Sequence, residues 1–357
     1  MRVSKTQDDE SYYWDQDLSL ENLVKPHAPT VMRVWSGHLY LGLRDFDGGA
    51  KLLRSRDGSQ WESITSSGFG DKNNGDIYGL ANFNGRIYCG TYNGVFQGHG
   101  MSLPSSGGQI WRSENGIDWE LVVKGGLGNI NNQDMWSFME FHDHLYVGTW
   151  NPDSGGQIWR SIDGKTFSQA FTTDSPDQSY IRSFAVNDNK IYASTGKSSL
   201  VIYESTDGLY WRDISSGVLP DYLTCGTQIT SVCGTLVIGS TKWRTGPVEI
   251  WTYSDQHWKL IARVSQQLPT ASLISSMTPY GERGVIITVW DDICGVTLYF
   301  CEDIEDARWI QINESGFGDN IHSGGRTEIF RNNIFVCTCT SAVNRKSRIW
   351  RGTKLKG

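Results

Sequence analysis

The chain has 357 residues, with 40 Gly, 15 Trp, 15 Tyr and 13 Phe, and a formal net charge of −7. Its aromatic content excludes a disordered chain, the absence of a Gly-X-Y period excludes collagen, and no stretch approaches the roughly 20 consecutive apolar residues of a membrane helix. The negative charge argues against nucleic acid or an anionic membrane as the main partner.

The chain begins with MRVSKTQDDE, which is polar and acidic where a secretory signal has an apolar core. We therefore expect a cytoplasmic protein. The seven cysteines include no CxxC pair, and we interpret them as reduced thiols. No sequence motif for a metal, a nucleotide or a hydrolase nucleophile stands in its required context, so we expect neither a metal nor a cofactor.

From residue 31 onward, a two-part unit recurs seven times. Its first part is an apolar strand, a polar turn and an aliphatic-aromatic strand, at residues 31–43, 78–91, 136–149, 182–195, 230–240, 277–289 and 328–338. Its second part is a tight turn between two further strands, at residues 48–64, 105–122, 153–170, 198–214, 247–261, 296–312 and 347–357. Four short strands in every 40–50 residues are typical of a β-propeller blade. The sequence thus predicts one all-β domain over residues 1–357, a seven-bladed β-propeller with four antiparallel strands per blade.

The seventh unit ends before its fourth-strand aromatic, and the N-terminal segment supplies a substitute. In the other units this aromatic lies 19 to 22 residues before the next first-strand anchor, and Trp14 lies 21 residues before Trp35. We expect a strand over residues 11–18 to complete the blade formed by residues 327–357. Such closure leaves no exposed sheet edge between the two ends of the chain.

Four of the tight turns follow the pattern S-x-[DN]-G-x-x-[WF], at residues 55–61, 113–119, 161–167 and 205–211. This pattern resembles the Asp-box (BNR) repeat of sialidase-like propellers, although its spacing is one residue shorter. The resemblance implies the fold and places these turns on the face opposite the active site. The residue types in these turns fit a structural role, because Asp or Asn accepts hydrogen bonds from turn amides and Gly takes a positive φ.

The candidate site lies on the other face, where the loops that precede the first strands and those that follow the second strands meet. The loop at 93–106 is about ten residues longer than its counterparts, and long loops on a rigid scaffold often carry function. Acid-base candidates on this face are Asp76, Asp134 and His99. Candidate ligand-binding residues are Tyr78, Tyr92, Trp136, Trp150, Trp243, Trp290, Arg182, Lys242 and Arg326, and Arg44 is a further cation there.

Aromatic rings beside carboxylates suit a carbohydrate, because rings stack on the apolar faces of sugars while Asp accepts hydroxyl hydrogen bonds. The alternative is structural: Asp76 and Asp134 cap loops while Tyr78 and Trp136 belong to the blade core. We interpret the protein as a propeller that binds a glycan or another small polar or aromatic molecule at one composite site at the channel mouth.

Two other functions stay open. The first is an enzyme, such as a polysaccharide lyase, a glycoside hydrolase or another acid-base catalyst, that uses the same site. The second is a protein-interaction scaffold. The resemblance does not extend to sialidase activity, because the arginines lie at unmatched registers and no tyrosine-glutamate pair is present. The sequence predicts no particular oligomeric state.

Overall fold

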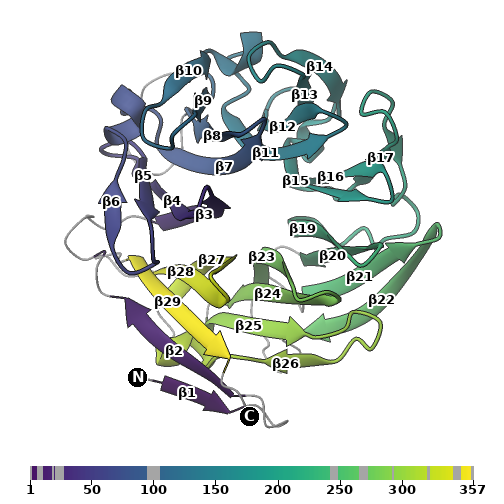
Figure 1. The fold of residues 1–357 in the computed structure, drawn as a ribbon. Coiled ribbons are helices and arrows are strands. Elements are labelled where there is room, and N and C mark those ends of the chain that lie inside the picture. The colour runs from purple at the N-terminus through teal and green to yellow at the C-terminus, as the bar shows by residue number, and fades with distance from the viewer. Residues whose placement is uncertain are drawn as a thin grey trace. The chain divides into compact units, whose positions relative to one another are not determined.

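The computed structural model describes residues 2–5, 11–17, 20, 28–94, 105–241, 248–264, 272–291, 293–319, 322–340 and 347–354. Over these ranges the chain forms antiparallel β-strands and short 3-10 segments, and no α-helix (Figure 1). The chain divides into two compact units. The central unit comprises residues 40–54 and 63–221, and the terminal unit comprises residues 1–39, 55–62 and 222–357.

The central unit contains three consecutive groups of four antiparallel strands, preceded by β4 and β5. The groups are β7–β10, β11–β14 and β15–β18. The strands are β4 (His38–Arg44), β5 (Lys51–Ser55), β7 (Asp76–Phe83), β8 (Arg86–Tyr92), β9 (Ile110–Ser113), β10 (Glu120–Val123), β11 (Asp134–Phe141), β12 (His144–Trp150), β13 (Gln157–Ser161), β14 (Ser168–Thr172), β15 (Tyr180–Asn187), β16 (Lys190–Gly196), β17 (Ile202–Ser205) and β18 (Arg212–Asp213). The 3-10 segments are η2 (Ser67–Gly70), η3 (Gly126–Gly128) and η4 (Pro176–Gln178).

The terminal unit contains two further groups of four strands, β19–β22 and β23–β26, and a five-stranded sheet of order β1-β2-β29-β28-β27. The strands are β1 (Arg2–Lys5), β2 (Ser11–Asp17), β3 (Ala28–Trp35), β6 (Trp61–Ser63), β19 (Cys225–Val232), β20 (Thr235–Thr241), β21 (Val248–Ser254), β22 (His257–Val264), β23 (Ser272–Tyr280), β24 (Gly284–Asp291), β25 (Gly295–Cys301), β26 (Trp309–Gln311), β27 (His322–Phe330), β28 (Asn333–Thr340) and β29 (Ser347–Lys354). A short 3-10 segment, η5 (Ser315–Gly318), follows β26.

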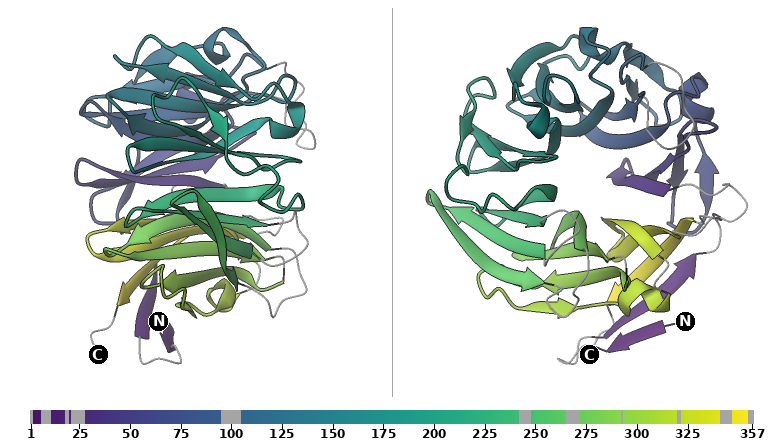
Figure 2. Two further views of the ribbon diagram at one scale, coloured as in Figure 1. Left: turned by 90° about the vertical axis from the view of Figure 1, so that its right-hand side faces the viewer. Right: turned by 180° about the vertical axis from the view of Figure 1, so that it is seen from behind.

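The five-stranded sheet joins strands from opposite ends of the sequence. Strand β2 pairs with β29, with Tyr12 opposite Lys354 and Asp17 opposite Ile349. Figures 1 and 2 show the purple β2 beside the yellow β29 from three sides. The fold prediction placed β2 here with four strands, but β1 adds a fifth through the pairing of Arg2 with Trp14.

The second strand of each group lies between its neighbours and is buried on both faces. In β8, for example, every residue from Ile87 to Tyr92 is buried, whereas the outer strand β14 has no buried residue. Small residues let neighbouring groups approach closely. A Cβ added to Gly90 would lie 2.2 Å from the backbone oxygen of Met135 in the next group. The apolar run in each second strand therefore reflects two-sided burial, as a core strand requires.

The four S-x-[DN]-G turns share one hydrogen-bond pattern. In the first copy, Ser59 and Gln60 donate backbone N–H groups to Asp57 Oδ1 at 2.8 and 2.9 Å, and Gly58 donates to Ser55 Oγ at 2.8 Å. Asn115, Asp163 and Asp207 accept the equivalent pairs of N–H groups. Because these N–H groups stabilise the carboxylate, the pKa of Asp57 falls to about 2. The turns are thus fixed by their own polar side chains.

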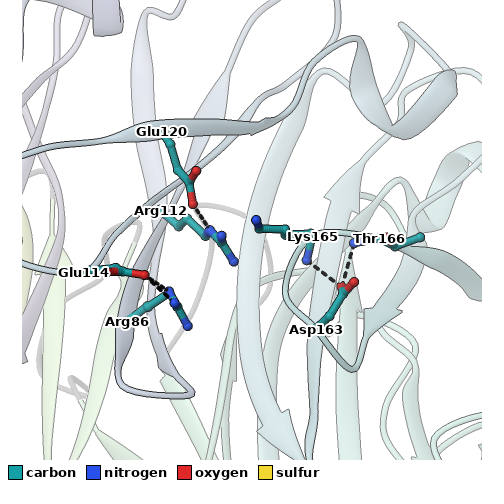
Figure 3. A network of polar contacts seen from close by, with 7 residues as sticks. All are labelled: Arg86, Arg112, Glu114, Glu120, Asp163, Lys165 and Thr166. Carbon is teal, nitrogen blue, oxygen red and sulfur yellow. Dashed lines mark hydrogen bonds and ion pairs between the residues drawn. The ribbon is translucent and has the colours of Figure 1, made fainter.

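Ion pairs surround these turns in the central unit (Figure 3). Arg86 pairs with Glu114, and Arg112 pairs with Glu120 across β9 and β10. The aliphatic and guanidinium parts of Arg112 are almost fully buried while Glu120 is exposed. Arg112 therefore helps to pack the outer strands, whereas exposed pairs of this kind contribute little stability.

Candidate functional site

The predicted site residues divide between the two units. Asp76, Tyr78, Tyr92, Asp134, Trp136, Trp150 and Arg182 belong to the central unit, and Trp290 and Arg326 belong to the terminal unit. His99, Lys242 and Trp243 lie outside the described residues. The central unit therefore contains most of the predicted residues that have a described structure.

Backbone pairing brings the ends of the central strands together. Asp76, at the start of β7, pairs with Tyr92 at the end of β8, and Asp134 pairs in the same way with Trp150. Single pairs then connect the groups, because Tyr92 also pairs with Asp134, and Trp150 pairs with Tyr180. These five residues form one continuous row of paired backbone positions.

A bulge interrupts the ladder of each first strand two residues after this row. The irregularities lie between Ile77 and Gly79, between Met135 and Ser137, and between Ile181 and Ser183. The extra residues are Tyr78, Trp136 and Arg182. Bulges redirect side chains and are frequent beside functional sites. The repeat thus places two rings and a guanidinium at equivalent positions.

The aromatic side chains of this region form a continuous cluster. The rings of Tyr78 and Trp136 stack with centroids 3.9 Å apart, and those of Trp150 and Tyr180 stack at 5.2 Å with an angle of 5°. Trp136 meets the ring of Tyr180 edge-on at 4.9 Å. Tyr92 also stacks on Trp150, with centroids 5.6 Å apart. We call these five rings the ring cluster.

Two arginines lie against the ring cluster. The guanidinium carbon of Arg182 is 5.1 Å from the ring centroid of Trp136 and 4.6 Å from that of Tyr180. The guanidinium carbon of Arg44 is 5.4 Å from the ring centroid of Tyr78 and 5.2 Å from that of Phe46. These are cation–π distances, so each arginine lies against two rings. Phe46 also meets Tyr92 edge-on at 6.0 Å.

Asp76 is fully buried and its charge is paired. Arg44 donates from Nε to Asp76 Oδ2, and a second nitrogen of the same guanidinium donates to the Tyr78 hydroxyl. The backbone N–H of Ile77 donates to Asp76 Oδ1 at 2.8 Å. Asp76 therefore connects Arg44 to the start of β7, which holds the guanidinium in place beside Tyr78.

Asp134 is also fully buried, but neither of its carboxyl oxygens has a hydrogen-bond partner among the described residues. Burial, reinforced by the charge of Asp76 and opposed by Arg44, raises the pKa of Asp134 well above its ordinary value. The Tyr92 hydroxyl and the Trp150 indole N–H nearby also lack described partners. The two aspartates occupy equivalent backbone positions, yet Asp76 is paired with Arg44 while the carboxyl oxygens of Asp134 have no partner among the described residues.

The side chains of this region differ in their exposure to solvent. Tyr78, Trp136, Trp150 and Tyr180 are partly exposed, whereas Asp76, Asp134 and Tyr92 are buried. A ligand approaching from solvent would therefore meet the exposed parts of these four rings first. The carboxyl groups lie beneath this surface.

Buried amides hold the loops that lead into β7 and β11. Asn74 donates from its amide to the backbone oxygen of Gly68 and to Gln109 Oε1, both at 2.9 Å. Asn132 makes the equivalent bonds to Gly126 and Gln157 at 2.9 and 2.8 Å. These networks fix the loop ends that carry Asp76 and Asp134, and the sequence analysis did not identify them.

In the terminal unit, the two predicted residues make structural contacts. Arg326 donates to the backbone oxygens of Thr30 and Ser275, each at 2.7 Å. Trp290 packs against the core cluster that contains Val296 and Trp14.

Sequence reasoning missed Tyr180 and Phe46. Tyr180 begins β15 as Asp76 begins β7, so alignment of the repeats could have found its position. This position holds a tyrosine where the other two units have an aspartate, so a comparison limited to carboxylates does not identify it. Phe46 follows β4 and has no equivalent in the repeat pattern.

Over the described ranges, no group of three or more His, Cys, Asp or Glu side chains is arranged to hold a metal ion. The described part of the chain also contains no helix that is long and apolar enough to cross a membrane.

No protein-family model matches the sequence, and no curated protein sequence matches it. Solved structures resemble it at low identity. A GH74 enzyme from Niastella koreensis is 16% identical with a TM-score of 0.56, covering 90% of this chain and 54% of its own. The polysaccharide lyase Uly1 is 10% identical with a TM-score of 0.53, covering 91% and 90%. The sialidase of Trypanosoma rangeli is 13% identical with a TM-score of 0.50, covering 92% and 55%.

This chain thus spans about half the length of the GH74 enzyme and of the sialidase. At such identities the likeness concerns the fold alone. The chain shares the all-β fold of these enzymes.

Proposed function

We propose that the protein is a carbohydrate-binding β-propeller whose glycan site is the ring cluster with Arg44 and Arg182. The observation that carries this proposal is a partly exposed set of stacked rings, flanked by two guanidinium groups and underlain by two buried carboxyl groups. Ring faces stack on the C–H faces of sugars, and the flanking polar groups bind hydroxyl or acidic substituents. Four of the five rings remain partly exposed to solvent.

The architecture that we propose has seven blades, closed by the N-terminal strand. Seven sequence repeats support the blade count. The pairing of β2 with β29 supports completion of the last blade by residues from the other end of the chain. The common geometry of the four S-x-[DN]-G turns supports their interpretation as Asp-box repeats.

A second candidate function is catalysis at the same place. The raised pKa of the buried Asp134 favours it, because acid-base enzymes use carboxyl groups whose pKa is raised by burial. In this proposal Asp134 supplies a proton, and Asp76 and His99 are further acid-base candidates. The names of the similar structures, a GH74 enzyme, a polysaccharide lyase and a sialidase, are compatible with a glycan as substrate.

The first test is a glycan array probed with the wild-type protein and with the Trp136→Ala variant. We expect binding of a restricted set of glycans by the wild type and loss of that binding in the variant. Tyr210→Ala is the control, because Tyr210 is 82% exposed on a turn of the central unit and belongs to no cluster. Equal loss in both variants, or no glycan bound, would contradict the proposal.

Turnover of the bound glycans separates the two functions. A binding protein leaves them unchanged. An enzyme converts them, and Asp134→Asn abolishes conversion while the glycan still binds.

A further inference from the structure

The carboxyl group of Asp134 is enclosed by its strand neighbours. Backbone pairing sets Asp134 directly opposite Tyr92 on one side and directly opposite Trp150 on the other. Residues directly opposite one another in antiparallel strands project their side chains from the same face of the sheet. The rings of Tyr92 and Trp150 also stack on each other. Asp134 is therefore flanked by two rings that meet across its strand.

These three neighbours all carry buried polar atoms that have no partner among the described residues. Asp134 is fully buried, and neither of its carboxyl oxygens has a hydrogen-bond partner there. The Tyr92 hydroxyl and the Trp150 indole N–H are buried and unpartnered in the same way. Buried polar groups in proteins nearly always have a partner, so three exceptions at adjacent strand positions call for a functional explanation.

Charged and titratable side chains reach the region of Asp134 from the strands around β11. Strands β7, β8, β12 and β15 pack against β11. The groups in question, from these strands and from β4, are Asp76, Arg44, Cys89, Tyr92, Tyr180 and Arg182. Arg44 favours the charged form of Asp134, but its guanidinium is hydrogen-bonded to Asp76. Burial and the charge of Asp134 raise the pKa of Cys89 and of Tyr92, so both stay protonated at neutral pH.

An ionised carboxylate is poorly tolerated in this enclosure. Burial, reinforced by Asp76, raises the pKa of Asp134, so the enclosed group holds its proton to a higher pH than an exposed aspartate does. Once the proton leaves, an unpartnered buried charge costs much more free energy than one aromatic contact contributes. Trp150 is partly exposed whereas Tyr92 and Cys89 are buried, so water reaches the carboxylate most directly by displacement of the Trp150 ring.

We propose that loss of the Asp134 proton displaces the Trp150 ring and opens the ring cluster, so that glycan affinity falls as pH rises. This regulation rests on the glycan site proposed above. Trp150 stacks on both Tyr92 and Tyr180, so its displacement breaks two contacts of the ring cluster. The apparent affinity of a protein is reduced by the fraction of molecules that are not competent to bind. Ionisation of Asp134 lowers the competent fraction, because the glycan binds the stacked rings.

The first test needs no glycan. The full-length protein is labelled with fluorotryptophan, and the Trp150→Phe variant identifies the fluorine NMR resonance of Trp150. We expect this resonance to move in one transition between about pH 5 and about pH 9 in the wild type and to stay fixed in Asp134→Asn. The matched control is Asp143→Asn, because Asp143 is exposed in the turn between β11 and β12, and this variant should titrate as the wild type does. A fixed resonance in the wild type, or an equal movement in Asp134→Asn, would overturn the proposal.

The second test titrates the glycan identified on the array at the two ends of this pH range. We expect at least about a fivefold loss of affinity at the higher pH in the wild type and in Asp143→Asn, and less than about a twofold change in Asp134→Asn. Affinity that does not depend on pH in the wild type, or that falls equally in Asp134→Asn, contradicts the regulation. If the array identifies no glycan, the proposed function fails, and the fluorine titration still decides whether Asp134 opens the ring cluster.

Discussion

The first strands of the central and terminal units share one backbone irregularity but place different side chains at it. In the central unit the extra residues are Tyr78, Trp136 and Arg182. In β23 of the terminal unit the extra residue is Ser275, whose hydroxyl donates to the backbone oxygen of Thr288 at 3.1 Å. The same bulge therefore presents large rings and a cation in one unit and a small, internally bonded residue in the other.

Strand β27 extends this contrast. Its irregularity falls between Ser323 and Arg326 and includes Gly325, which has a φ of +137°. A Cβ at Gly325 would lie 2.8 Å from the Thr288 methyl group, so no side chain fits there without a shift. The irregular pairing recurs in both units, whereas the residues at the bulges differ between them. For this reason our functional proposal concerns the central unit.

The largest expected effect concerns the buried pair that holds Arg44 at the ring cluster. Asp76→Asn preserves the shape of the side chain but leaves the Arg44 guanidinium, which is 23% exposed, without its carboxylate. We expect the free energy of unfolding to fall by about 3–5 kcal/mol, as for other broken buried pairs. Chemical denaturation at pH 7 measures it. Glu120→Gln, which removes an exposed partner of Arg112, is the control and should change stability little.

The second prediction compares one tryptophan from each unit. Trp150→Ala removes a ring that stacks on both Tyr92 and Tyr180, and it should weaken glycan binding by at least about 30-fold. Trp290→Ala removes a ring that packs on the core of the terminal unit, and it should change affinity by less than about threefold. Isothermal titration with the glycan identified on the array measures both. Equal losses would extend the site to the terminal unit and contradict a site confined to the central one.

Much of the secondary structure could be predicted from the sequence because the repeats carry it. The equivalence of Asp76 with Asp134 followed from aligned loops, and the shared pairing with Tyr92 and Trp150 confirms that alignment. The bulges could not be predicted, since a one-residue irregularity leaves the repeat length unchanged. Strand β1 was missed because its four residues have no counterpart in the repeat.

The different environments of the two aspartates also could not be predicted from the sequence. Asp76 and Asp134 occupy the same position in the pattern, and only the structure shows that Arg44 bonds to the first. Arg44 lies more than 30 residues away from Asp76 in sequence. The spacing of neighbouring residues therefore does not reveal that Arg44 pairs with Asp76 and not with Asp134. Blade number and closure remain predictions that the sequence repeats support.

The third prediction concerns Asp134 and the pH dependence of stability. Because its folded pKa is raised, the folded protein holds a proton that the unfolded chain releases above about pH 3.8, so this group reduces stability as pH rises. Asp134→Asn should remove this decrease in stability with rising pH. We expect the variant to exceed the wild type by about 1–3 kcal/mol at pH 8 and to approach it near pH 4. Thermal unfolding across this pH range measures the difference, and a variant less stable than the wild type at pH 8 would contradict it.

The smallest expected effect compares the same turn in the two units, where Asp57 occupies the terminal copy and Asn115 the central copy. Both side chains accept two backbone N–H groups, so Asp57→Asn should change stability little at pH 7, whereas Asp57→Ala should cost about 1 kcal/mol, as the loss of a helix N-cap does.

The two copies of the turn should differ in how their stability depends on acid pH. The pKa of Asp57 is lowered to about 2 from an ordinary 3.8, so its contribution is complete above about pH 4 and is lost as pH falls toward 2. Asp57→Asn should remove this loss, and Asn115→Asp should introduce one, as measured by denaturation at pH 2 to 5. If neither substitution changes the acid dependence, backbone geometry alone holds the turns, and the shared side chain is not what stabilises them.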